Sequence, residues 1–96
     1  MSLGVIAVLK VAEGRNSEFE QLATQLTTKV IENESKCNFY QFHKSRENGQ
    51  TYIAIEQYVD QSAFDAHGKS DYFRSLSKAM GACMTAPPKI EFVDSI

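Results

Sequence analysis

Residues 52–73 read YIAIEQYVDQSAFDAHGKSDYF, and this stretch decides the fold. Its first eight residues alternate with the period of two that is typical of a β-strand, and both sets of side chains are half apolar. We therefore expect both faces of the strand to be covered. Asp60 is a typical N-cap residue, so a helix is predicted to follow directly. The rise per residue of strand and helix then places His67 roughly above Glu56 and Gln57.

The chain after His67 predicts a second helix and a last strand. Gly68 is suited to end the first short helix, and Ser70 is suited to cap the next one, which Gly81 ends. Two prolines then exclude further helix. The alternating residues 89–92 predict a strand.

The chain before residue 52 predicts a strand, a helix and another strand. The apolar residues 4–11 read as a strand, and Ser17 with Glu20 fits a capping box for a helix over about residues 18–33. Residues 37–44 form the next predicted strand. Asn48-Gly49 is a strong hairpin signal, so this strand should run antiparallel to the one that begins at Tyr52.

This element order is the split β-α-β pattern of a ferredoxin-like α+β sandwich, with helices on one face of a four-stranded antiparallel sheet. The other face needs a cover. We expect this cover to be the same sheet of a second copy, which predicts a homodimer. The apolar residues expected there are Ile53, Ile55 and Val59, with Phe39 or Phe42.

Composition narrows the class of protein. The 96 residues predict one domain, 1–96, and the apolar fraction of 43% and charged fraction of 23% are ordinary for a globular chain. The start of the chain does not read as a signal peptide, and no apolar run is long enough for a membrane span, so we expect a cytoplasmic protein. A net charge of −2 with scattered Lys and Arg argues against a nucleic-acid partner.

The cysteines and histidines do not predict a metal site. Cys37 and Cys83 lie far apart without secretory context, so they are expected to be free thiols. Together with His43 and His67 they match no zinc spacing. The sequence thus predicts no metal site.

His67 and Glu56 are the candidate catalytic residues, and each has two interpretations. His67 either takes a proton from a phenolic or enolic substrate, or only ties the short helix to the sheet. Glu56 is unusual within a strand and needs a partner. It either orients His67 or binds a backbone amide or basic side chain and so holds a loop in place.

Aromatic side chains are the candidate substrate-binding residues. They either line a pocket between sheet and helices, with hydroxyls that orient a planar ligand, or pack in the core. Core packing is the competing interpretation for Phe64 and Phe73 above all, because of their helical spacing. The five candidates are Tyr40, Tyr58, Tyr72, Phe64 and Phe73.

The segment I-E-Q-Y-x-D-x-x-A-F-x-A-H-x-x-S-x-Y-F, together with Glu34-x-x-Cys37 followed by Tyr40, resembles the antibiotic biosynthesis monooxygenase (ABM) family. The resemblance covers nearly the whole chain. It implies a dimeric α+β barrel and an oxygenase that oxidises a small phenolic or quinol-like substrate without metal or flavin. Tyr58 stands where the family usually has Trp, and Tyr72 where His is frequent.

The same resemblance leaves other functions open. The family includes an isomerase, so a small-molecule binder or isomerase on this scaffold is the alternative to an oxygenase. Haem-degrading members carry an axial His on the helix after the S-x-x-F element. Residues 74–80 contain no His, so haem degradation is disfavoured. A purely structural dimerisation module is a third interpretation, and it predicts no enclosed pocket between sheet and helices.

Overall fold

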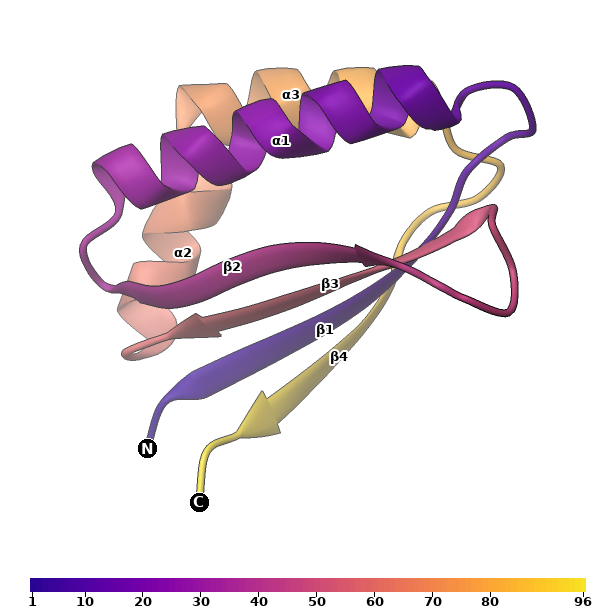
Figure 1. The fold of residues 1–96 in the computed structure, drawn as a ribbon. Helices are drawn as coiled ribbons and strands as arrows, with labels where there is room; N and C mark the ends of the chain where they lie inside the picture. Colours follow the sequence, from indigo (N-terminus) through magenta and orange to yellow (C-terminus); the bar gives the residue numbers. More distant parts are fainter.

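A computed structural model describes residues 1–96 and contains four strands and three helices. The elements in chain order are β1 (Leu3–Lys10), α1 (Asn16–Asn33), β2 (Cys37–Lys44), β3 (Thr51–Tyr58), α2 (Gln61–Lys69), α3 (Asp71–Gly81) and β4 (Lys89–Asp94). The strands form one antiparallel sheet in the order β2-β3-β1-β4. All three helices lie on the same side of the sheet (Figure 1). The predicted ferredoxin-like α+β fold is confirmed.

The central strand β3 has one buried and one partly exposed face. Ala54, Glu56 and Tyr58 point toward the helices and are 2%, 7% and 0% exposed. Ile55 on the opposite face is 39% exposed, and its cross-strand neighbours are Ile6 and Gln41. The alternation in the sequence therefore separates a helix-covered inner face from an outer face that this chain leaves open.

The sequence left two candidates on β2 for the outer face, Phe39 or Phe42, and the structure places Phe39 there. Phe39 pairs with Gln57 on the outer face and is 46% exposed. Phe42 pairs with Ala54 on the inner face and meets the ring of Phe19 edge-on at 6.3 Å. The two residues are three positions apart in one strand and therefore lie on opposite faces, so only one of them can belong to the outer face.

The predicted capping box of α1 is wrong. The helix begins at Asn16 after Arg15, whose side chain makes no capping bond, so Ser17 already lies in the first turn. Glu20 has tertiary partners instead. Its carboxylate accepts a hydrogen bond from the Tyr52 hydroxyl and lies 3.6 Å from Nζ of Lys44.

The helix pair after β3 has two caps that the sequence predicted correctly, Asp60 and Ser70, and one stop, Gly68, that it did not. Asp60 caps α2 by accepting from the backbone N–H of Ala63 at 2.9 Å. The helix continues through Gly68, whose φ is not positive, and ends at Ser70. The Ser70 hydroxyl donates to the carbonyl of His67 at 2.7 Å and accepts from the N–H of Phe73 at 3.3 Å. Ser70 thus closes α2 and caps α3.

None of the three helices has the length and apolar character needed to cross a lipid bilayer.

Candidate functional site

The inner face of β3 carries the first part of the candidate site. Glu56 and Tyr58 are two positions apart, so their side chains point the same way. The Tyr58 hydroxyl donates a hydrogen bond to Oε1 of Glu56 at 2.7 Å, and both residues are buried. The predicted partner of Glu56 was His67, a backbone amide or a basic side chain. That prediction is wrong, since the partner is a neighbouring tyrosine of the same strand.

Glu56 has the most informative titration behaviour in the site. Burial raises its pKa from 4.5 to about 7, and the nearby charge of Glu34 acts in the same direction. The hydrogen bond from Tyr58 opposes this rise, because it stabilises the carboxylate. A carboxyl group with such a pKa exchanges its proton near neutral pH, as a general base must.

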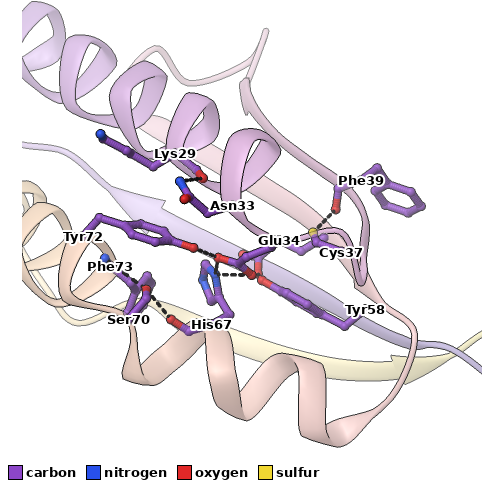
Figure 2. A network of polar contacts seen from close by, with 11 residues as sticks. Lys29, Asn33, Glu34, Cys37, Phe39, Tyr58, His67, Ser70, Tyr72 and Phe73 are labelled. Carbon is purple, nitrogen blue, oxygen red and sulfur yellow. Dashed lines mark hydrogen bonds and ion pairs between the residues drawn. The ribbon is translucent and has the colours of Figure 1, made fainter.

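His67 pairs with Glu34 and not with Glu56. Its Nδ1 lies 2.9 Å from Oε2 of Glu34, with the imidazole N–H donating to the carboxylate (Figure 2). His67 is 2% exposed, whereas the Glu34 side chain is 13% exposed. Glu34 is the C-cap residue at the end of α1, so this contact joins α1 to α2. The predicted orientation of His67 by Glu56 is wrong.

Tyr72 is the second residue that binds the Glu34 carboxylate by a hydrogen bond. Its hydroxyl donates to the same oxygen that His67 contacts (Figure 2). Burial and this hydrogen bond raise the pKa of Tyr72 to about 12, so its proton stays in place at neutral pH. Sequence reasoning did not select Glu34 as a site residue. The only signal was its place in the Glu34-x-x-Cys37 motif.

Aromatic rings enclose the imidazole. The ring centroids of Phe73, Tyr40 and Tyr58 lie 4.5, 5.3 and 5.4 Å from that of His67. Phe64 packs on Tyr58 at 5.4 Å, outside this set. Four of the five predicted aromatic residues therefore contact the His67–Glu34 pair, three of them at the imidazole and Tyr72 at the carboxylate.

An apolar cavity of about 110 Å³ lies between the inner face of the sheet and α3. Ten of its thirteen lining residues are apolar, and Glu56 is the only one with an ionisable carboxyl group. Tyr40 and Phe73 also line it, whereas Tyr58, His67, Tyr72 and Phe64 do not. Three of the predicted site residues thus line the cavity, and the other four do not.

Two polar atoms at this cavity have no protein partner. No fully buried side-chain N or O atom in the chain lacks a hydrogen bond. Oε2 of Glu56 and Oη of Tyr40 make none, so both keep contact with space that a water molecule can enter. Both residues line the cavity, and they are cross-strand partners on β2 and β3. A ligand hydroxyl that reaches both side chains would meet one carboxylate oxygen and one phenolic hydroxyl.

A groove of about 380 Å³ lies on the outer side of Glu34 and is also lined by Cys37, Ser70 and Tyr72. Glu34 therefore stands between this groove and the buried His67. Burial raises the pKa of Cys37 to about 11, so its thiol is not an activated nucleophile. No three His, Cys, Asp or Glu side chains lie close enough together to hold a metal ion.

Comparison with known proteins agrees with the resemblance seen in the sequence. The family model for the antibiotic biosynthesis monooxygenases, ABM, matches residues 2–79. The comparison with curated proteins gave no significant match. A crystal structure from Caulobacter crescentus, of a protein proposed to be an antibiotic biosynthesis monooxygenase, superposes with a TM-score of 0.96 at 37% identity. That alignment covers 99% of this chain and 90% of the other.

More distant structures share the fold alone. A conserved protein from Methanosarcina mazei has a TM-score of 0.93 at 22% identity, covering 97% of this chain and 91% of its own. The protein Rv0793 from Mycobacterium tuberculosis has a TM-score of 0.90 at 21% identity, covering 100% of this chain and 96% of its own.

Proposed function

The chain belongs to the antibiotic biosynthesis monooxygenase family, and on that premise we propose that it oxidises a small phenolic or quinol-like substrate with dioxygen, without metal or flavin. The observation that carries this proposal is Glu56. Its carboxyl group lies at the wall of an apolar cavity, has a pKa of about 7 and keeps one oxygen free of protein partners.

Glu56 is the proposed general base. A phenolic hydroxyl at the polar end of the cavity transfers its proton to Oε2 of Glu56, which leaves an electron-rich phenolate. Reaction of a quinol with dioxygen then places one oxygen atom on the ring and releases the other as water. The substrate supplies all four electrons and leaves as a hydroxyquinone, so no further reductant is needed.

His67 is the proposed positioning residue of this site. Glu34 holds its Nδ1, and its ring is packed among Tyr40, Tyr58 and Phe73. Through these contacts His67 fixes the two tyrosines that flank Glu56. The Tyr58 hydroxyl keeps one Glu56 oxygen occupied, so the other one faces the cavity.

The outer face of the sheet supports the proposed homodimer. Ile6, Ile53 and Ile55 lie together at the centre of this face, with Phe39 beside them on β2. Ile55 and Phe39 are 39% and 46% exposed in the single chain. The same sheet of a second copy would bury these side chains around a two-fold axis.

A small-molecule binder or isomerase on the same scaffold is the second candidate function. The hydroxyls of Tyr58 and Tyr72, at the two positions that depart from the family pattern, are both bound to carboxylates. With both hydroxyls occupied in this way, the site would bind a ligand without oxidising it. A purely structural module, which predicts no enclosed pocket between sheet and helices, is the third interpretation. The partly open cavity beside Glu56 favours a ligand-binding function over it.

Oxygen uptake with a panel of phenols and quinols tests the proposal. We expect uptake by the wild type in the presence of a metal chelator and after removal of flavin. Glu56→Gln should abolish uptake, and His67→Ala should reduce it. Binding of panel members without any uptake would favour the binder or isomerase. Equal uptake by wild type and Glu56→Gln would exclude Glu56 as the base.

A further inference from the structure

The dimensions of the cavity limit what fits beside Glu56. Its volume is about 110 Å³. An apolar protein cavity of about 150 Å³ holds one benzene molecule. The cavity beside Glu56 is somewhat smaller than that, so it has room for no more than a single ring between the sheet and α3.

Three residues of α3, Phe73, Ser77 and Met80, line the side of the cavity opposite the sheet. Ser77 and Met80 are three positions apart, so they lie on the same face of the helix. Met80 is 4% exposed, and Ala54 lines the cavity from the buried face of β3. Next to Phe73, the space is thus bounded by one small and one large side chain of α3, across from the small side chain of Ala54.

The polar residues on the sheet side of the cavity lie together. Tyr40 and Glu56 are cross-strand partners, and Oη of Tyr40 and Oε2 of Glu56 make no hydrogen bond to the protein. The cavity is also lined by Pro88 and Ile90, and Ile90 is 51% exposed, which marks the side where the cavity approaches solvent. A ring with one hydroxyl matches this polarity, because its hydroxyl reaches Glu56 and its carbons contact apolar side chains.

We propose that this cavity selects phenols with a single ring, and that Ser77 and Met80 are the residues that determine this size limit. The inference rests on the proposed function for the choice of a phenol as the ligand. The ring lies between Ala54 and Met80, and its hydroxyl lies at Glu56 and Tyr40. Substrates with fused rings are excluded by the side chains of α3.

Anaerobic titration of the ¹⁵N-labelled protein with phenol and with 1-naphthol, followed by NMR, tests this inference apart from any oxidation. Phenol should shift the amide signals of Tyr40, Ala54 and Ser77 saturably, and 1-naphthol should bind roughly tenfold more weakly or not at all. Comparable affinity for the two ligands, or shifts confined to other surfaces, would overturn the proposal.

A pair of substitutions at Ser77 provides the matched control. Ser77→Leu should fill the cavity and abolish phenol binding, whereas Ser77→Ala should keep it. Met80→Ala should admit 1-naphthol. If Met80→Ala does not fold, the two Ser77 variants still test the site. Phenol binding that survives Ser77→Leu would contradict the assigned site.

The two proposals fail in different ways. Size-selective phenol binding without oxygen uptake would remove the oxygenase and leave the single-ring site. Oxygen uptake with fused-ring quinols by the wild type would support the oxygenase and remove the size limit.

Discussion

Nδ1 of His67 lies 2.9 Å from Oε2 of Glu34, a residue 33 positions earlier in the chain. This contact joins the C-terminal end of α1 to the last turn of α2, and the Tyr72 hydroxyl of α3 binds the same carboxylate. One carboxylate thus connects all three helices at the side of the site that faces away from the cavity.

Removal of this carboxylate should destabilise the fold. Glu34→Ala leaves the Nδ1 of a buried histidine and the hydroxyl of Tyr72 without their acceptor, which costs about 2 kcal/mol in free energy of unfolding. Glu34→Gln should cost less, because its amide oxygen still accepts one hydrogen bond. Urea denaturation measures both values. Glu32→Ala, at an exposed position of the same helix, is the control and should be nearly neutral.

Glu56 should make stability depend on pH in an unusual direction. Its folded-state pKa of about 7 lies above the ordinary value of 4.5, so the folded protein holds this proton more tightly than the unfolded chain. The stability that follows is present below about pH 4.5 and is lost as the pH rises through 7.

The wild type compared with Glu56→Gln isolates this effect, because Gln resembles the protonated acid and does not titrate. The difference in free energy of unfolding between the two proteins should change by about 3 kcal/mol between pH 4.5 and pH 8, in favour of the variant at high pH. A difference that does not vary with pH would contradict the raised pKa.

The hydrogen bond from Tyr58 should lower the pKa of Glu56. Its hydroxyl stabilises the Glu56 carboxylate, so Tyr58→Phe should raise the Glu56 pKa above 7 and move the pH at which stability falls upward. Tyr52→Phe is the matched control. It removes another hydroxyl from an inward-facing tyrosine of β3, but that hydroxyl binds Glu20. The control should leave the midpoint unchanged, and an equal shift in both variants would contradict the assignment to Tyr58.

A charge on the outer face should dissociate the proposed dimer. Ile55→Glu places a carboxylate at the centre of the face that a second copy would cover, where desolvation of an unpaired charge is costly. Light scattering after size-exclusion chromatography should give a dimer for the wild type and a monomer for this variant. Ile31→Glu, at a 73% exposed position of α1, should remain dimeric. A monomeric wild type would remove the homodimer.

The fold could be predicted from the sequence where local rules decide it. The strand alternation of residues 52–59, the Asp60 cap and the hairpin at Asn48-Gly49 depend on neighbours in the chain, and the structure confirms each one. The Ser17 box and the stop at Gly68 were wrong. There, tertiary partners of Glu20 and the hydrogen bonds of Ser70 decide the local structure.

The candidate site was predicted in its members but not in its pairing. The rise per residue of strand and helix predicted that His67 lies at the level of β3, and its ring does pack on Tyr58. The same arithmetic says nothing of what the end of α1 contributes, so the Glu34 partner was missed. The division of the site into a cavity at Glu56 and a packed wall at His67 depends on side-chain packing, which a sequence pattern does not contain.

The direct titration of Glu56 by ¹³C NMR, with the side-chain carboxyl carbon labelled and Glu56→Gln used to assign the signal, tests the central claim that this group is a neutral-pH base. The account predicts a midpoint near pH 7 in the free protein, and a perturbed titration when phenol is bound. A midpoint near the ordinary glutamate pKa of 4.5 would contradict it, because the carboxylate would then be too weak a base for the proposed proton transfer.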